Sequence, residues 1–327
     1  MSENVLVYGA YGHTGKFVVA ELLDRGFTPL PSGRDKDRLH FPGLDPRPAT
    51  VDDPASLDRA LEGAAAVVNC AGPFATTAAP LISAALRAGI PYVDVAAEIE
   101  ANVDTFAEFA DARTPVIPAM AFFGGLGDLL VTALLDGETA ADEVHIAYGL
   151  DSWHPTAGSL DAGAVSHRRR AGRRVRYSGG GLQYHDDPLP TVRWPFPDGP
   201  LPVLAEFTMA DVVTIPSHVE VAEVRTYMAT RAAADLTATT PTAPEPVDAR
   251  GRSAQTFVVD AVVHIGDTKR RAVATGQDIY AVSAPLAVEA VHRLLTGRTR
   301  ATGVASAGTA FDAADFLRAL APHIAIS

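Results

Sequence analysis

The stretch NVLVYGAYGHTGK, residues 4–16, decides the fold of this chain. It begins as a short apolar run, continues through glycines spaced three residues apart, and ends in the start of a predicted helix. A strand, spaced glycines and a helix in this order are typical of the first turn of a dinucleotide-binding βαβ unit. We expect Gly9 to make the tight turn, Gly12 to let the backbone approach a pyrophosphate, and Gly15 to let the helix pack on the strand.

Other residues of this turn are candidates for the same site. Thr14 offers a hydroxyl, and the free N–H groups at a helix start bind phosphate oxygens. Tyr11 and His13 lie within the turn, and we assign both to the cofactor site. The spacing is G-x-x-G-x-x-G instead of G-x-G-x-x-G, so a purely structural turn is the alternative interpretation.

The sequence PSGRDKDRL, residues 31–39, follows the second predicted strand and bears on which dinucleotide binds. An acidic residue here would bind the ribose 2′-hydroxyl of NAD. In this chain Ser32 stands near that position and Arg34 follows, whose guanidinium suits a 2′-phosphate. Asp35 supports the competing NAD interpretation, because it lies twenty residues past Gly15. We expect NADP(H), with Ser32 and Arg34 in the site.

The sequence VVNCAGPF, residues 67–74, ends the fourth predicted strand. Ligands of doubly wound folds lie beyond the carboxyl ends of the strands, so this turn would run beside the ribose and nicotinamide. The cofactor contacts predicted here are Asn69, Cys70, Ala71, Gly72 and Pro73, with Phe74 on the substrate side. Cys70 has no obvious base partner, so we interpret it as a small packing residue and not as a nucleophile.

Strands and helices alternate along the first 120 residues. The expected strands are residues 4–8, 27–33, 48–51, 64–72, 91–96 and 114–120. The expected helices are residues 13–26, 52–63, 77–89 and 99–113. Nearly all-apolar strands that alternate with helices predict a parallel sheet covered on both faces. The fold class is therefore α/β, with a doubly wound, Rossmann parallel sheet.

The pattern changes after about residue 142. Strand-like or alternating segments cover residues 142–150, 219–229, 254–266 and 268–280, with Gly266-Asp267 as a hairpin turn. They predict an inserted, mainly antiparallel α+β second domain. The predicted divisions are a dinucleotide-binding domain at 1–125, an inserted domain at 126–280, and helices at 281–327 that return to the first domain. Residues 237–246, TATTPTAPEP, predict an exposed loop or a linker.

Composition and charge exclude several classes of function. The chain has 327 residues, of which 47% are apolar and 20% charged, an ordinary globular composition. Its net charge of −12 argues against nucleic acid or an anionic membrane as the main partner. The single cysteine rules out a cysteine-rich metal site, so we expect no metal, and it suits a cytoplasmic protein. Pro73 and Pro80 help to break the uncharged stretch at 64–86 into pieces too short to span a bilayer.

The motifs VYGAYGHTGK, SGRDKDRL, VVNCAGPF and YVDVAAE occur in this order, and the chain resembles the saccharopine dehydrogenase-like family. That group includes trans-acting enoyl reductases. The resemblance covers residues 4–130 well and continues more loosely through 274–295. It implies an N-terminal Rossmann domain, an inserted sheet domain that covers the nicotinamide, and NADPH-linked chemistry. Short-chain dehydrogenases share the glycine spacing, but no tyrosine here has a lysine four residues later, which excludes their mechanism.

Five side chains are candidates for the chemistry itself. His154 is a candidate proton donor because its ordinary pKa lies near neutrality, and Tyr280 is a second candidate donor. Asp94 and Glu98 flank the end of the fifth strand and are candidate substrate residues, or else a helix cap and a first-turn acid. Asp128 interrupts an apolar run, so it either faces the cleft or caps the following helix.

The segment HRRRAGRRVRY, residues 167–177, concentrates positive charge in an acidic protein. A solvated hairpin is one interpretation, and a docking site for an anionic substrate tail is the other. We predict an NADPH-dependent oxidoreductase that reduces a C=N, C=O or activated C=C bond of a small molecule. The alternative is a non-catalytic NADP(H)-binding regulatory or scaffold protein. A homodimer through the second sheet is expected only by analogy.

Overall fold

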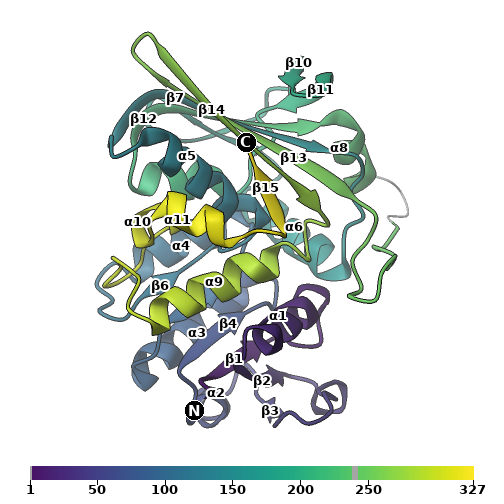
Figure 1. The fold of residues 1–327 in the computed structure, drawn as a ribbon, viewed down its shortest axis with the longest axis vertical. Helices are drawn as coiled ribbons and strands as arrows, with labels where there is room; N and C mark the ends of the chain where they lie inside the picture. The colour runs from purple at the N-terminus through teal and green to yellow at the C-terminus, as the bar shows by residue number, and fades with distance from the viewer. Residues whose placement is uncertain (1, 238–241) are drawn as a thin grey trace.

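The computed structural model describes residues 2–237 and 242–327 (Figure 1). Two sheets organise the chain, a six-stranded sheet built from the N-terminal part and a nine-stranded sheet built from the rest. In Figure 1 the first sheet lies at the bottom of the view and the second at the top, with helices between them. Of the linker predicted at 237–246, residues 238–241 lie outside the described residues.

The first sheet is entirely parallel, with strand order β3-β2-β1-β4-β5-β6. Its strands are β1 (Asn4–Tyr8), β2 (Thr28–Gly33), β3 (Arg47–Pro48), β4 (Ala66–Asn69), β5 (Tyr92–Asp94) and β6 (Val116–Ile117). The order reverses between β1 and β4, which is the topological switch point where ligands of such sheets bind. The prediction of a doubly wound α/β domain is confirmed.

Helices cover both faces of this sheet, because successive strand residues point to opposite sides. They are α1 (His13–Asp24), α2 (Pro54–Leu61), α3 (Phe74–Ala88) and α4 (Ile99–Glu108), with a short helix η1 (Lys36–Arg38) after β2. Val5 and Val7 of β1 pack in one core cluster with α1, whereas Leu6 and Tyr8 pack in another with α2 and α3. The alternating burial explains why these strands are apolar at every position.

Several element boundaries differ from the sequence expectation. The third helix was expected at 77–89 but begins at Phe74, directly after Pro73 at the N-cap position, where a backbone N–H is not needed. The sixth strand was expected at 114–120 and is reduced to Val116–Ile117. The chain leaves the sheet there because the Ala119 N–H bonds to the Asp94 carboxylate instead of a neighbouring strand.

The second sheet runs β10-β11-β12-β7-β13-β14-β15, with β8 pairing with β12 and β9. Its strands are β7 (Ala140–Leu150), β8 (Arg174–Ser178), β9 (Gly181–His185), β10 (Thr191–Phe196), β11 (Gly199–Ala205), β12 (Glu220–Ala229), β13 (Thr256–Ile265), β14 (Thr268–Gln277) and β15 (Ile324–Ile326). Most pairs are antiparallel and β7–β12 is parallel. The mainly antiparallel sheet and the Gly266-Asp267 hairpin turn are therefore confirmed.

The remaining helices connect and cover this sheet. They are η2 (Phe122–Leu126), α5 (Gly127–Leu135), α6 (Ala157–Arg169), α7 (Asp211–Thr214), η3 (Ile215–Ser217), α8 (Thr230–Leu236), α9 (Ser283–Leu295), α10 (Ala307–Ala310) and α11 (Ala313–Ala319). Within the described ranges, each helix is too short or too polar to cross a membrane.

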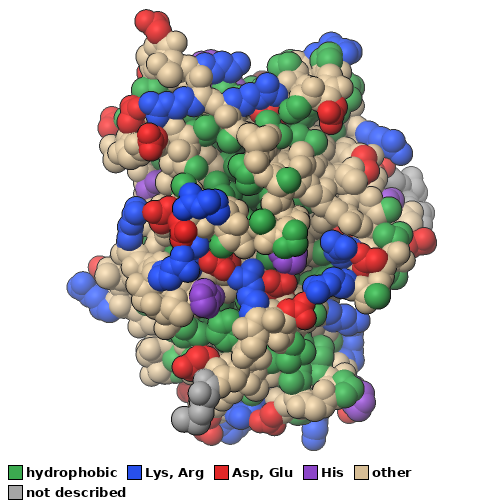
Figure 2. Space-filling view, viewed as in Figure 1, with side chains coloured by type: hydrophobic (Ala, Val, Ile, Leu, Met, Phe, Trp, Pro, Cys, Tyr) green, Lys and Arg blue, Asp and Glu red, His purple; other side chains and the backbone are tan. Residues whose placement is uncertain are grey.

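The C-terminal segment contacts both sheets. In Figure 1, α9 lies across the middle of the molecule against α1, and Arg25 of the α1 end pairs with Glu289 of α9. Arg293 is almost fully buried and binds Glu289 at 2.6 Å and Asp315 at 2.9 Å. Figure 2 shows basic and acidic side chains interspersed at this height of the molecule. The last strand, β15, then joins the edge of the second sheet beside β14.

Candidate cofactor site and active site

The glycine loop after β1 has the geometry that close backbone approach requires. Gly9 has φ +83°, and a Cβ on it would lie 2.9 Å from the Ala71 nitrogen. A Cβ on Gly15 would overlap the Gly9 carbonyl oxygen. Gly12 precedes α1 and has no side chain that could cap the helix. The N–H groups of His13 and Thr14 are thus left at an uncapped helix start, the arrangement that binds a pyrophosphate.

Two buried polar atoms at this loop have no partner within the described chain. They are Oγ of Ser32, which is fully buried at the end of β2, and Nε2 of His13. Burial lowers the pKa of His13, so its ring is neutral at physiological pH. Buried polar groups are normally paired, and a dinucleotide lying over the loop would supply acceptors and donors for both atoms. These residues therefore fit the expected cofactor.

Arg34 and Asp35, which favour NADP(H) and NAD respectively, have different environments at the end of β2. Arg34 is exposed immediately after the strand. Asp35 is committed to the backbone instead, because its Oδ1 accepts a hydrogen bond from the Asp37 N–H at 3.1 Å and starts η1. The Arg38 guanidinium lies over the Tyr11 ring at 4.3 Å, so the glycine loop and the basic segment are in direct contact.

The Asn69 side chain shapes the next turn from inside the protein. Its Oδ1 accepts from the Ala71 N–H at 3.0 Å, and its Nδ2 donates to Thr77 Oγ1 and to Tyr92 Oη. Asn69 is fully buried and its side chain supports the turn, while the cofactor contact expected for it stays a prediction. Burial raises the pKa of the Cys70 thiol, which keeps it neutral and disfavours a nucleophilic role.

Asp94 is a buried positioning residue at the end of β5. Its Oδ1 accepts from the N–H groups of Ala96 at 3.0 Å and Ala119 at 2.8 Å, and its Oδ2 accepts from Tyr92 Oη at 2.9 Å. The carboxyl is 1% exposed, and burial raises its pKa to about 6. The structure therefore uses Asp94 to hold the loops after β5 and β6, including the left-handed Ala119 with φ +55°, and does not present it to a substrate.

Glu98 lies where a substrate residue was expected. Its Oε1 accepts a hydrogen bond of 3.0 Å from the backbone N–H of Phe74, the first residue of α3. Burial raises the pKa of this carboxyl to about 7, against the lowering effect of the Phe74 hydrogen bond. The structure thus brings Glu98 to the Gly72–Phe74 turn as an acid that is partly protonated at neutral pH.

The helix α6 lies over this turn. A Cβ on Gly72 would be 3.7 Å from the carbonyl oxygen of Gly158 and 3.8 Å from Cβ of Ala162, so the helix is in ordinary van der Waals contact with it. Thr156 caps α6, because its Oγ1 accepts from the Ser159 N–H at 3.1 Å. At the other end, Arg169 pairs with Asp104 of α4 at 2.7 Å.

Tyr280 joins the cofactor loop to α6. Its hydroxyl lies 3.2 Å from Trp153 Nε1, 3.3 Å from the Thr156 N–H and 3.0 Å from Ser159 Oγ. Its ring meets the His13 ring edge-on, with the centroids 5.2 Å apart. The structure therefore brings together Tyr280 and the glycine loop, as a site at this position requires.

Two other candidates are placed differently. His154 is half-buried beside Trp153, at the entry to α6, with its ring not fixed by any hydrogen bond from the described chain. Asp128 is fully buried, and its carboxylate binds His218 Nε2 at 2.6 Å and the Gly308 N–H at 2.7 Å. Although burial opposes it, Asp128 raises the pKa of His218. Asp128 therefore anchors α10, and its carboxylate does not cap α5.

The basic segment 167–177 is divided between two elements instead of forming one hairpin. Residues 167–169 end α6, and Arg174 and Arg176 lie on β8. Arg169 is committed to Asp104, and Arg174 donates to the carbonyl oxygens at 186 and 187. Two of these arginines, Arg169 and Arg174, thus hold α6 and β8 in place.

The residues that hold α6 and Tyr280 are not among those predicted from the sequence. Trp153, Thr156 and Ser159 surround the Tyr280 hydroxyl, and Asp278 accepts from the Tyr280 N–H at 2.9 Å. Asp278 has φ +59°, an uncommon conformation for a non-glycine residue. The spacing of Thr156 and Ser159 is a helix-start signal and could have located α6, whereas the contact with Tyr280 spans more than 120 residues.

Comparison with known proteins agrees with this geometry. Residues 5–116 match the family described as the saccharopine dehydrogenase NADP binding domain. A curated relative from Arabidopsis thaliana, named "Probable mitochondrial saccharopine dehydrogenase-like oxidoreductase", is 31% identical over 119 residues, which cover 30% of this chain and 26% of the relative. The chain thus spans about a quarter of the length of that relative.

A solved structure extends the likeness of fold to the whole chain. The apo, histidine-tagged saccharopine dehydrogenase (L-Glu forming) from Saccharomyces cerevisiae superposes with a TM-score of 0.65 and 10% identity, covering 100% of this chain and 99% of that one. At this identity the match concerns the fold alone. Residues 5–116 therefore match the saccharopine dehydrogenase NADP binding domain family, and the whole chain shares its fold with that solved structure.

Proposed function

We propose that this protein is an NADPH-dependent oxidoreductase that reduces a C=N, C=O or activated C=C bond of a small molecule. One observation carries the proposal: the glycine loop, the Gly72–Phe74 turn, Glu98 and Tyr280 converge at the carboxyl ends of β1, β4 and β5, beneath α6. The family match of residues 5–116 supports the cofactor class.

The preference for NADPH over NADH rests on the end of β2. Asp35 Oδ1 caps η1 by accepting from the Asp37 N–H, whereas Arg34 is exposed two residues after Ser32, whose buried hydroxyl has no partner in the described part of the chain. A guanidinium and a hydroxyl together suit the 2′-phosphate. We assign the pyrophosphate to the helix start at Gly12–Gly15 and the 2′-phosphate to Ser32 and Arg34. When bound there, the nicotinamide supplies the hydride.

Glu98 is the proposed proton donor. Its pKa of about 7 leaves a substantial protonated fraction at neutral pH, and its hydrogen bond to the Phe74 N–H fixes it at the turn. Tyr280 is assigned a structural role instead, because its hydroxyl accepts from Trp153 and Thr156 and is hydrogen-bonded to Ser159 Oγ at the start of α6. His154, the other donor expected from the sequence, has no such fixed orientation.

The helix α6 would exclude water from the reacting bond. It contacts the Gly72 turn, and its ends are held by Tyr280 and by Asp104. A substrate would lie between α6 and the Gly72–Phe74 turn, with any anionic tail toward the basic end of α6, where Arg168 is exposed. The substrate itself, a homodimer and a cytoplasmic location stay predictions.

The test is to mix purified protein with NADPH and a panel of imines, ketones and enoyl thioesters, and to follow nicotinamide absorbance. The proposal predicts oxidation with at least one class of acceptor, and a loss of that oxidation in Glu98→Gln. Tight NADPH binding with no oxidation across all three classes would contradict the enzyme and favour the non-catalytic regulator instead.

A further inference from the structure

The second sheet has an outer face that points away from the cofactor site. Tyr148 of β7 points inward, where its ring packs against Phe123 with centroids 4.9 Å apart. Because successive strand residues alternate, its sequence neighbours Ala147 and Gly149 belong to the opposite side, as does His145. A pocket on this outer face is therefore separated from the glycine loop by the thickness of the sheet and its core.

The pairing register places chemically distinct residues side by side on that face. Along one line across the sheet, Arg225 of β12 pairs with His145 of β7, which pairs with Val262 of β13 and then Arg271 of β14. The next line on the same face contains Glu143, His264 and Lys269. Side chains from four adjacent strands thus surround one small area of the sheet.

The β10–β11 hairpin folds over this area and is fixed there by a buried carboxylate. Asp260 is fully buried, and its Oδ2 accepts from Trp194 Nε1 at 2.8 Å. The Arg271 guanidinium donates to both oxygens of Asp260 and to the Pro195 carbonyl oxygen. The buried Asp260 carboxylate, bonded to Trp194 and to the partly exposed Arg271, thus fixes Trp194 as one wall of the area.

A second aromatic wall is equally constrained. His145 Nδ1 lies 3.0 Å from Tyr227 Oη and its Nε2 lies 3.0 Å from Glu143 Oε2, so both ring nitrogens are occupied. The rings of Trp194 and Tyr227 lie 4.7 Å apart between centroids. Together with Pro195 and Val262 they line an open pocket of about 300 Å³, the lower end of the range of small-molecule sites.

The charges around this pocket leave one cation unmatched. Asp260 is paired with Arg271, and Glu143 is hydrogen-bonded to His145. Arg225 Nη2 lies 3.7 Å from Glu143 and 3.7 Å from Glu223, so it is shared between them. Lys269 is exposed and forms no ion pair within the described residues.

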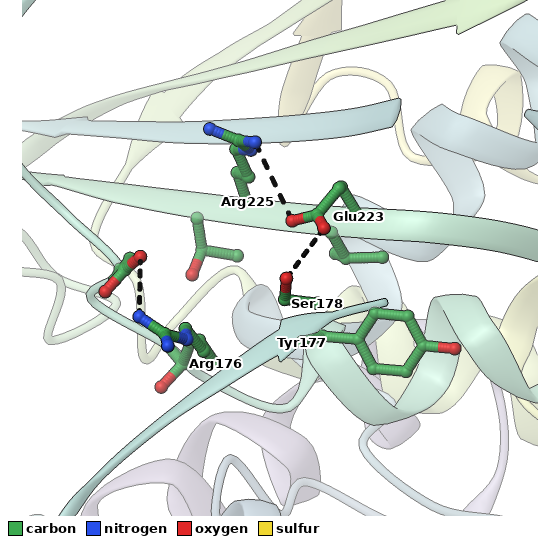
Figure 3. A pocket seen from close by; sticks show the side chains of 9 residues that line it. Arg176, Tyr177, Ser178, Glu223 and Arg225 are labelled. Atoms are coloured by element: carbon green, nitrogen blue, oxygen red, sulfur yellow. Dashed lines mark hydrogen bonds and ion pairs between the residues drawn. The ribbon is translucent and has the colours of Figure 1, made fainter. Parts of the chain in front are cut away.

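In the neighbouring pocket around Arg176, of about 150 Å³, both arginines of the lining have carboxylate partners. Figure 3 shows Glu223 between Arg225 and Ser178, and Arg176 pairs with Glu206 at 3.8 Å.

We propose that the pocket lined by Trp194, Tyr227 and Lys269 is a binding site for a small aromatic carboxylate. Its ring would pack against the fixed faces of Trp194 and Tyr227, and its single negative charge would meet the Lys269 ammonium. The site is independent of the proposed oxidoreductase activity, because it lies on the other face of the sheet.

The experiment uses the two tryptophans of the full-length protein as reporters. Protein labelled with 5-fluorotryptophan gives one ¹⁹F resonance for Trp153 and one for Trp194, and Trp153→Phe assigns them. Benzoate is titrated into the millimolar range at constant ionic strength. We expect a saturable shift of the Trp194 resonance and no shift of the Trp153 resonance.

Charge selection is tested with matched probes and variants. Benzyl alcohol and benzylamine carry the same ring without the negative charge, and each should bind at least about tenfold more weakly. Lys269→Met should weaken benzoate binding to a similar extent. Arg231→Met, which removes an exposed cation on α8, should leave it unchanged.

The proposal is overturned by a Trp194 resonance that does not respond to benzoate, by equal responses to all three probes, or by unchanged binding in Lys269→Met. Addition of NADPH to the same sample separates this site from the cofactor site. A Trp153 response to NADPH with a silent Trp194 resonance under benzoate would leave the cofactor proposal standing and this one refuted.

Discussion

The backbone N–H of Phe74 donates to the carboxylate of Glu98 at 3.0 Å, which ties the fifth-strand loop to the first residue of α3. Both residues border the turn that faces the expected nicotinamide. Burial raises the pKa of the same carboxyl to about 7. Glu98 is therefore both fixed at this turn and partly protonated at neutral pH.

Glu98→Gln tests that acidity. The amide keeps an acceptor for the Phe74 N–H but has no proton to donate, so we expect kcat to fall about 10²- to 10⁴-fold with little change in NADPH affinity. In the wild type, reduction should be fastest while Glu98 is protonated and should fall as pH rises through about 7. Steady-state kinetics over pH 5–9 check both points, and an unchanged profile in the variant would refute the role.

Tyr280→Phe tests the junction between the cofactor loop and α6. The change keeps the ring beside His13 and removes the oxygen that accepts from Trp153 and Thr156. We expect a loss of about 1–3 kcal/mol in unfolding free energy, because two half-buried donors lose their acceptor. The substrate KM should rise more than kcat falls. Chemical denaturation and kinetics measure these effects, and a variant indistinguishable from the wild type in both would show that the junction is unimportant.

Gly9→Ala tests the close approach in the glycine loop. Both Gly9 and Gly26 have positive φ, at +83° and +80°, but a Cβ on Gly9 lies 2.9 Å from Ala71 whereas Gly26 faces open space. Gly26→Ala therefore reports the backbone strain alone, about 1 kcal/mol. We expect Gly9→Ala to abolish NADPH binding and Gly26→Ala to retain it. Equal effects of the two variants on binding would mean that crowding at the loop is irrelevant.

Asp94→Asn tests the buried carboxyl through the pH dependence of stability. Asp94 ionises at about pH 6 in the folded chain and at about 4 when unfolded, so the folded state holds more protons between these values. The free energy of unfolding should therefore fall as pH rises from about 4 to about 6. Asp211, whose burial also raises its pKa to about 6, acts with the same sign. The variant should have a shallower slope in denaturation experiments at several pH values, and an unaltered slope would contradict the assignment.

The first domain was predictable because its signals are local. Gly9, Gly12 and Gly15 lie close together in the sequence, and each strand of the parallel sheet is a short apolar run next to a helix. The hairpin at Gly266-Asp267 was predictable for the same reason. The role of Asp128 could not be settled from the sequence. Its hydrogen-bond partners, His218 and Gly308, are 90 and 180 residues away along the chain.

The position of α6 over the proposed site was not predictable from local patterns. The helix α6 has one buried residue, Ser166, so it lacks an apolar stripe, and its position depends on Tyr280 more than 120 residues later. The same holds for the outer pocket, where Asp260 joins Trp194 of a distant hairpin to Arg271. Contacts between remote polar residues leave no periodic signature in a single sequence.

The central claim is that the loop from Gly9 to Gly15 and the end of β2 bind a dinucleotide with a 2′-phosphate. Isothermal titration calorimetry of the full chain with NADPH and NADH measures this directly, with Arg34→Ala and Asp35→Asn as the paired variants. We expect saturable binding of NADPH, weaker binding of NADH, a loss of about 1–3 kcal/mol for NADPH in Arg34→Ala, and no loss in Asp35→Asn. No heat from either nucleotide with folded protein, or an NADH preference that disappears in Asp35→Asn, would contradict the account.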